Sequence, residues 1–352
     1  MNKRIIILVT VLLAVMISSA APKPKNVIFL IGDGMGIAQI YAGMVANGNS
    51  FNIEQFRHVG FSKTYSYDNF TTDSAAGGTA LSSGVKTRNG MIGMNPDSTK
   101  VETILEQAER NGLSTGIVVS CAVTHATPAS FIAHQINRGM EEEIAADFLK
   151  TDIDVFIGGG RKYFEKRKDG KNLTEELKSK DYQVVYSLEE IKNIKSGKVA
   201  GLIADGHPAA MPDRGDMLPE ATSVALNLLK SNKKGFFLMI EGSQIDWGNH
   251  SNDANYSNRE MIDFDNTIGK VLEFAKKDSN TLVIITADHE TGGLTLPSGN
   301  LKNKEVKAKY TTGGHSGVVV PVFAYGPGAE QFTGFMENTS FKGKIAKLLK
   351  LR

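Results

Sequence analysis

The sequence of 352 residues contains a single cysteine, Cys121. One cysteine cannot form an internal disulfide, so packing and not crosslinking must stabilise the folded chain. The chain also lacks a strong net charge, since its formal value is only +2 at pH 7. It has no compact block of lysine and arginine with interleaved aromatic residues. These two absences argue against a nucleic-acid partner.

Long hydrophobic runs are scarce as well. The one extended run, Ile5–Ile17, is shorter than the roughly 20 residues that a helix needs to cross a bilayer. Lys3 and Arg4 precede this run, and small residues follow it at 18–21. The pattern predicts a cleaved signal peptide over residues 1–20, with an uncleaved anchor as the alternative. We therefore expect export to the periplasm or the extracellular space, and no membrane span once the signal is removed.

The chain shows no internal repeat and no linker rich in proline and serine. Residues 21–352 are therefore expected to form a single domain. The stretch 161–198 is rich in lysine, glutamate and aspartate. Such charge predicts a solvated peripheral insertion without site chemistry.

Continuous apolar runs predict strands that are buried on both faces of a sheet. They lie at 26–31, 116–120, 155–157, 236–240, 281–286 and 318–323. Helical patterns lie between them at 101–110, 140–150, 219–230 and 258–276. This alternation predicts an α/β fold, a three-layer sandwich whose central, mostly parallel sheet is flanked by helices. In such a sheet, ligands bind beyond the carboxyl ends of the strands.

The first predicted strand ends in Gly32-Asp33-Gly34-Met35-Gly36. A dinucleotide-binding loop needs the spacing G-x-G-x-x-G and an acidic residue about 20 positions later, and the glycines here are spaced differently. An aspartate between two glycines instead offers a carboxylate with little steric cover, which suits a metal ligand. Asp33 can equally be an ordinary turn aspartate, so both interpretations stay open at this point.

A run of small residues from Thr72 to Ala80, TDSAAGGTA, predicts a helix that begins near Ser74. Asp73 or Ser74 can simply cap this helix. Alternatively, the backbone N–H groups of the helix N-terminus can hold a phosphate, and the small neighbours then let a substrate approach the Ser74 hydroxyl. The local sequence alone favours the cap.

Acidic residues and histidines gather after later predicted strands and near the C-terminus. They are Glu241, Asp246, His250, Asp288, His289 and His315. The D-x-x-x-H spacing of Asp246 and His250 lets both side chains face one ion. Mixed carboxylate and imidazole donors suit zinc, whereas oxygen donors alone suit magnesium. Each cluster can be a capped turn by itself, but so many carboxylates would be costly to keep without metals that balance their charge.

With these clusters in view, the sequence resembles the alkaline phosphatase family along nearly all of the chain after the signal. The motifs that carry the resemblance are NVIFLIGDGMG from Asn26, TDSAAGGTA from Thr72, HATPASFIAHQINR from His125, EGSQIDWGNH from Glu241, TADHETGG from Thr286, and GGHSG followed by PVFAYGPGA. The resemblance implies hydrolysis of small-molecule phosphate monoesters through a phosphoserine intermediate on Ser74. It further implies two zinc ions (Zn2+), one magnesium ion (Mg2+) and a homodimer, because family members are often dimers.

The resemblance also implies which residues hold the metals and the phosphate. The first zinc would be bound by Asp246, His250 and His315, the second by Asp33, Asp288 and His289 beside Ser74, and the magnesium by Asp33, Thr127 and Glu241. Arg138 matches the arginine that clamps the phosphate, and its planar fork of N–H donors suits two phosphate oxygens.

Two positions near the phosphate vary among members of the family. His125 stands where some members carry aspartate, and Trp247 stands where some carry lysine or histidine. The imidazole removes a carboxylate from near the magnesium site, and the indole removes a cation from near the phosphate. We therefore expect altered metal affinity and phosphate release, with the reaction class unchanged.

Three other functions fit parts of this pattern. A phosphodiesterase of the same superfamily would keep the metal ligands but lack the set formed by Arg138, Thr127 and Glu241. A sulfatase would need C/S-x-P-x-R, and neither Ser74 nor Cys121 has that context. A non-catalytic phosphate- or metal-binding protein would have no need of Ser74.

Overall fold

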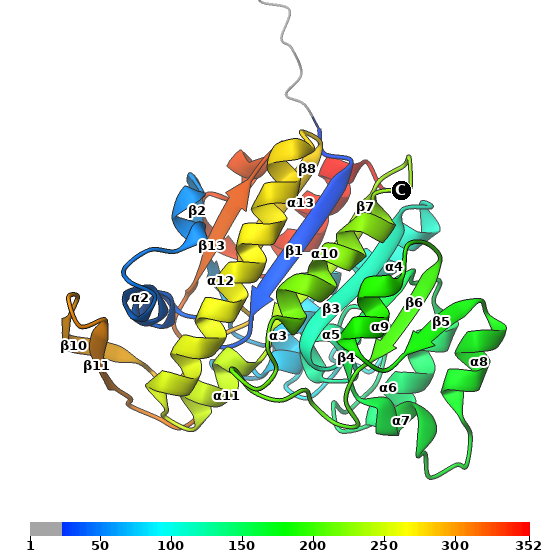
Figure 1. The fold of residues 1–352 in the computed structure, drawn as a ribbon, viewed down its shortest axis with the longest axis horizontal. Helices are drawn as coiled ribbons and strands as arrows, with labels where there is room; N and C mark the ends of the chain where they lie inside the picture. Colours follow the sequence, from blue (N-terminus) through cyan, green and yellow to red (C-terminus); the bar gives the residue numbers. More distant parts are fainter. Residues whose placement is uncertain (1–22) are drawn as a thin grey trace, which may run out of the picture.

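A computed structural model describes residues 23–352, so the signal peptide expected over 1–20 lies outside the described residues. The main sheet is built from β1 (Asn26–Gly32), β2 (His58–Lys63), β3 (Ser114–Ala122), β4 (Val155–Gly159), β5 (Tyr182–Val185), β6 (Lys198–Leu202), β7 (Phe236–Gly242), β8 (Thr281–Thr286), β13 (Val320–Tyr325) and β14 (Gly334–Glu337). Its ten strands follow the order β14-β2-β13-β8-β1-β7-β3-β4-β6-β5 (Figure 1).

The sheet is mostly parallel, as predicted. Among the described strands of this sheet, β13 alone runs against its neighbours, pairing antiparallel with both β8 and β2. Every apolar run predicted as a strand forms one, at the centre of the sheet or next to it. The strands without a sequence prediction are β2, β14, β5 and β6, which occupy the two outermost positions on each side.

Helices cover both faces of the sheet, because alternate residues of β1 enter two different hydrophobic cores. Val27, Phe29 and Ile31 point into one core, and Ile28 and Leu30 point into the other. The first core is covered by α3 (Ser74–Ser83), α4 (Ile104–Arg110), α6 (Glu141–Asp147) and α13 (Ser340–Leu349), and the second by α2 (Ile37–Ala46), α10 (Met217–Leu229) and α12 (Ala254–Lys277). Figure 1 shows α10 and α12 crossing one face of the sheet. The predicted three-layer sandwich is confirmed.

The charged stretch 161–198 is an edge of this sandwich. It forms α7 (Arg161–Glu165), α8 (Leu173–Ser179), β5 and α9 (Leu188–Asn193). Strand β5 pairs in parallel with β6, and Phe164, Leu177 and Ile191 are fully buried. The segment expected to be a solvated insertion therefore extends the main sheet and contributes side chains to its cores.

Short elements complete the described chain. They are α5 (Ala126–Ala129), α11 (Gln244–His250), the pairs β9 (Glu290–Thr291) with β12 (His315–Ser316) and β10 (Thr295–Asn300) with β11 (Glu305–Lys309), and the 3-10 turns Asn52–Gln55, Phe148–Lys150 and Ala329–Phe332. No helix within residues 23–352 combines the length and the apolarity needed to cross a membrane.

Candidate active site

The three central strands end side by side, and this brings distant carboxylates together. Ile31 of β1 pairs in register with Glu241 of β7 and with Thr286 of β8. Asp33 and Asp288 follow these positions at the same edge. Asp33, Glu241 and Asp288 are buried, each with at most 1% of its surface exposed. The predicted ligands thus meet beyond the carboxyl ends of parallel strands, where such a fold places its sites.

The loop after β1 reaches this edge because Gly34 has no side chain. Its φ of +70° lies in the left-handed region that favours glycine. A Cβ at this position would lie 2.9 Å from the Asp246 Cα and 2.7 Å from the Thr291 hydroxyl. The Gly34 N–H donates to Asp288 Oδ1 at 3.3 Å. Glycine at this position therefore lets Asp33 approach the ligands of α11 and β9.

Asp246, His250 and His315 converge in one group. His250 Nε2 lies 3.3 Å from Asp246 Oδ2, one helical turn earlier in α11, and His315 Nε2 lies 3.7 Å from Asp246 Oδ1. The opposite ring nitrogens face backbone carbonyls, with His250 Nδ1 at 2.7 Å from the Gly313 oxygen and His315 Nδ1 at 2.8 Å from the Thr72 oxygen. If each Nδ1–H donates to its carbonyl, both Nε2 lone pairs are directed at the same point, as in carbonyl-oriented metal ligands.

A second group forms around His289, whose Nε2 lies 3.2 Å from Asp288 Oδ2 and 3.5 Å from Asp33 Oδ1. The Ser74 hydroxyl lies 3.3 Å from the same nitrogen. Both carboxylate oxygens of Asp33 and one of Asp288 have no hydrogen-bond partner among residues 23–352. Buried carboxylate oxygens are normally paired with a donor or a metal, so this donor set fits a bound cation.

The pKa shifts in this cluster also indicate a cation site. Burial, reinforced by the neighbouring acids, raises the pKa of Asp33 well above its ordinary value and raises the pKa of Asp288 to about 7 and of Glu241 to about 8. Burial lowers the pKa of His289 well below its ordinary value, so the ring stays neutral and keeps a lone pair. The cluster therefore holds several carboxyl groups whose ionised forms need a positive charge.

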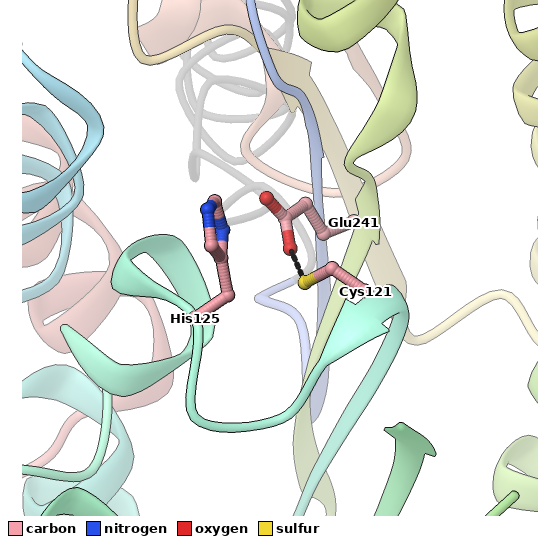
Figure 2. A group of neighbouring side chains, drawn as sticks. All are labelled: Cys121, His125 and Glu241. Atoms are coloured by element: carbon pink, nitrogen blue, oxygen red, sulfur yellow. Dashed lines mark hydrogen bonds between the residues drawn. The ribbon is translucent and has the colours of Figure 1, made fainter. Parts of the chain in front are cut away.

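The third predicted metal site lies beside Glu241 and the end of β3. Thr127 Oγ1 and Glu241 Oε1 are buried and have no hydrogen-bond partner in the described part of the chain. The Nδ1 atom of His125, at the N-terminus of α5, is also buried without a hydrogen-bond partner among the described residues. Cys121 Sγ lies 3.4 Å from Glu241 Oε2, and Figure 2 shows Cys121, His125 and Glu241 pointing toward one another. No role for Cys121 at this site was expected from the sequence.

Asp73 caps the N-terminus of α3. Its Oδ1 accepts from the Ala76 N–H at 3.0 Å. Ser74 is therefore the first residue of the helix, and its hydroxyl is directed to His289. Arg138 Nη1 donates to Asp73 Oδ2 at 3.1 Å, and Arg138 Nη2 lies 3.3 Å from His125 Nε2. Asp73 thus caps the helix and also holds the arginine beside Ser74.

The rings of Trp247 and His125 lie 5.9 Å apart between their centroids, and the His207 ring lies 4.7 Å from Trp247 and 5.7 Å from His125. Trp247 is partly buried and packs against the first core, the one that α3 covers. His125 and Trp247 are therefore in contact with one another. A substitution at one of them changes the surroundings of the other.

Thr291 was not predicted to belong to the site. Its hydroxyl donates to Asp246 Oδ1 and lies 3.3 Å from His289 Nδ1, so it touches ligands of both histidine groups. The only signal was its place two residues after His289 in the TADHETGG motif. Asp73 was noticed only as a cap, because its contact with Arg138 joins residues that are 65 positions apart.

Residues 24–309 match the sequence pattern of the family described as Alkaline phosphatase. The chain belongs to the alkaline phosphatase family. Alkaline phosphatase 4 of Bacillus subtilis is 38% identical, over 93% of this chain and 89% of the relative. The solved alkaline phosphatase from the Antarctic bacterium TAB5 is 46% identical with a TM-score of 0.90, covering 94% of this chain and 99% of that one.

A variant of the TAB5 alkaline phosphatase, with aspartate in place of a histidine, carries magnesium in its M3 site. That variant is 44% identical to this chain with a TM-score of 0.89, over 94% of this chain and 99% of its own. The family, the fold and the enzyme class expected from the sequence are confirmed. This alkaline phosphatase also brings the predicted ligands into groups that suit metal ions.

Proposed function

We propose that this alkaline phosphatase hydrolyses small-molecule phosphate monoesters through a phosphoserine intermediate on Ser74, with two zinc ions and one magnesium ion. The observation that carries the proposal is the position of the Ser74 hydroxyl. It lies at the N-terminus of α3 and 3.3 Å from His289 Nε2, within the group formed with Asp33 and Asp288. A serine in this position is next to a cation site and to free backbone N–H groups at once.

The donor chemistry supports zinc at two of the sites. Ligand atoms of Asp246, His289 and His315 lie within 4.8 Å of one another, and so do those of Asp33, Asp288 and His289. A tetrahedral zinc with Zn–N bonds of about 2.0–2.1 Å separates two nitrogen ligands by about 3.3 Å. The Nε2 atoms of His250 and His315 are 3.1 Å apart, so they fit a shared zinc with Asp246 as the third ligand.

Magnesium is supported at the third site by the oxygens of Asp33, Thr127 and Glu241, which include atoms without a partner among the described residues. Magnesium prefers oxygen donors in octahedral geometry. His125 brings an imidazole next to this set. We therefore propose that magnesium is held less tightly here than it would be beside an aspartate, in keeping with the aspartate variant of the TAB5 enzyme that carries magnesium.

When bound, the metals would supply Lewis-acid stabilisation of the entering and leaving oxygens and would lower the pKa of the serine hydroxyl. Ser74 Oγ, whose proton passes to solvent, attacks phosphorus while the bond from phosphorus to the leaving oxygen breaks, and that oxygen takes up a proton from water to give the alcohol. A water then attacks the phosphoserine and releases inorganic phosphate. Arg138, held by Asp73, and the N–H groups of α3 hold the nonbridging oxygens in both steps. Because these contacts all go to the phosphate, the alcohol part of the substrate is free to vary.

Two other activities predict different results. A phosphodiesterase would turn over diesters in preference, and a non-catalytic binding protein would turn over neither ester. The test is hydrolysis of a phosphomonoester and a phosphodiester by the native chain, Ser74→Ala and Ser83→Ala, each with added zinc and magnesium. Ser83 is the matched control, because it ends the same helix and donates only to Thr79.

We expect monoester turnover to fall at least about a thousandfold in Ser74→Ala, as it does in enzymes without their nucleophile. Turnover by Ser83→Ala should equal that of the native chain. Comparable turnover by Ser74→Ala would rule out the proposed nucleophile. A preference of the native chain for the diester would instead favour the phosphodiesterase.

We further propose that residues 21–352 act as one catalytic domain, exported to the periplasm or beyond after removal of 1–20, and that the domain forms a homodimer. The signal-like N-terminus supports the cleavage, and the single main sheet that runs through the described chain supports the one domain, whereas the homodimer rests on the family resemblance alone. Mass analysis of the secreted protein tests the cleavage, and light scattering of the purified protein tests the dimer.

A further inference from the structure

Cys121 has no part in the reaction proposed above, yet it lies within the site. It is the one cysteine of the sequence, and it is fully buried at the end of β3. Its Sγ lies 3.4 Å from Glu241 Oε2. A sulfur, an imidazole nitrogen and a carboxylate oxygen from Cys121, His125 and Glu241 all lie within 4.8 Å of one another (Figure 2).

Unpaired donors in the same place supply an independent reason to expect an ion. Glu241 and Thr127 are fully buried, and Glu241 Oε1 and Thr127 Oγ1 have no hydrogen-bond partner within residues 23–352. His125 Nδ1 is also buried without one. A thiol hydrogen bond to Glu241 Oε2 leaves all three of these atoms unsatisfied. Buried polar atoms are normally paired with a protein group, a water or an ion, so unpaired atoms beside Cys121 favour a bound ion.

The distance between sulfur and oxygen also fits a shared metal. With a Zn–S bond of about 2.3 Å and a Zn–O bond of about 2.0 Å, a tetrahedral zinc separates the two ligand atoms by about 3.5 Å. The observed separation of Cys121 Sγ and Glu241 Oε2 is 3.4 Å. The His125 nitrogen, which lies within 4.8 Å of both, has to approach when the ion binds.

We propose that Cys121, His125 and Glu241 form a thiolate zinc site, and that the third metal position of this chain takes zinc in preference to magnesium. Thiolate and imidazole donors select zinc, whereas magnesium keeps to oxygen donors. On binding, zinc replaces the thiol proton, which is released to solvent. The inference rests on the proposed function but replaces the magnesium ion proposed there for the third position with zinc, and it leaves the roles of Ser74 and the other two metals as they are.

Cobalt(II) reports this coordination directly, because a thiolate ligand gives cobalt a charge-transfer absorption in the near ultraviolet. The full-length mature protein is stripped with a chelator and reloaded with cobalt. Since the chain has one cysteine, any such band arises from Cys121. We expect the band in the native protein and its loss in Cys121→Ser, which replaces the sulfur with a smaller, harder donor.

Zinc binding in the presence of excess magnesium gives a second readout. The native protein should bind three zinc ions, and Cys121→Ser should bind two zinc ions and one magnesium ion. Loss of an outer-shell partner typically lowers metal affinity about 10- to 100-fold, so loss of this ligand should lower the zinc affinity of the third position by at least as much. Circular dichroism and thermal unfolding establish that the variant is folded.

A native protein without the charge-transfer band, whether its third position is filled or empty, would overturn the proposal. An unchanged zinc count in folded Cys121→Ser would do the same. If Cys121→Ser fails to fold, the spectrum of the native protein still decides. Turnover by Ser74→Ala is measured in parallel, so that failure of the proposed nucleophile and failure of the thiolate site give different results.

Discussion

The Nε2 atoms of His250 and His315 face each other at 3.1 Å, while the Nδ1 atom of each ring lies against a backbone carbonyl. When both Nδ1 atoms carry the proton, two lone pairs face one another beside the Asp246 carboxylate. Such an arrangement is stable only with a cation between the rings, either a proton or a metal. Metal binding and the stability of the fold are therefore linked at this site.

This linkage predicts how the loss of stability on metal removal depends on pH. In the metal-free folded chain the pKa of Asp288 is raised to about 7 and that of Glu241 to about 8, chiefly by burial. The unfolded chain loses the same protons near pH 4. Between these values the metal-free folded state binds more protons than the unfolded state, so its free energy of unfolding falls as pH rises.

In the metal-loaded protein the metals replace those protons, so its free energy of unfolding does not fall in this way as pH rises. The difference in melting temperature between metal-loaded and chelator-treated protein should widen between about pH 5 and about pH 8. Scanning calorimetry of both forms across this range measures it. A difference that stays constant or narrows would contradict the assignment of these carboxyl groups as ligands.

Arg138 should act on phosphate binding and leave the metals in place. Its Nη1 donates to Asp73 Oδ2 at 3.1 Å, which holds the guanidinium beside Ser74. A hydrogen bond to a charged group contributes about 1.5–3 kcal/mol, so Arg138→Ala should weaken inhibition by inorganic phosphate about 10- to 100-fold. Arg110→Ala is the control, because Arg110 pairs with Glu102 on the surface. Phosphate inhibition that is equal in both variants would exclude the clamp.

Thr291 should matter for metal affinity although it is not a predicted ligand. Its hydroxyl donates to Asp246 and can accept from the Nδ1–H of His289, so it orients one residue of each proposed zinc site. We expect Thr291→Val to lower zinc affinity about 10- to 100-fold, the usual cost of losing such a partner. Thr291→Ser keeps the hydroxyl and should bind zinc normally. Zinc titration against a competing chelator compares the two variants, and equal affinities would show that the hydroxyl is dispensable.

We expect His125 to influence which metal binds at the proposed third site. Burial, with Arg138 nearby, lowers the pKa of His125 to about 3, so the ring is a neutral nitrogen donor and not a source of negative charge. His125→Asp adds a carboxylate oxygen, which magnesium prefers. Magnesium affinity measured by calorimetry should therefore rise in His125→Asp. Indistinguishable affinities in the variant and the native protein would count against this role for His125.

The central strands could be predicted from the sequence because they are buried on both faces. All seven residues of β1 and of β7 are buried, which leaves a continuous apolar run. The outer strands lack that signal. In β14, Gly334 and Phe335 are exposed, and β5 is buried fully only at Tyr182. Their place in the sheet depends on strand pairing, which a local pattern does not record.

The site residues also divide into those with a local sequence signal and those without one. Asp33, Asp288 and Glu241 were predicted because polar residues directly after buried strands stand out locally. Neither Arg138 nor Thr127 comes directly after a strand, and only the resemblance to the family indicated them. Asp73 and Thr291 hold residues of the site through contacts between distant segments, and no local pattern indicates such contacts.

The most direct test of the account is to trap the phosphoryl group on the enzyme. Metal-loaded protein is incubated with a phosphomonoester, quenched in acid during turnover, digested and analysed by mass spectrometry, with Ser74→Ala treated in parallel. The account predicts one phosphorylated peptide containing Ser74 in the native protein and none in the variant. Phosphorylation at another residue, or turnover by the native protein with Ser74 never modified, would contradict it.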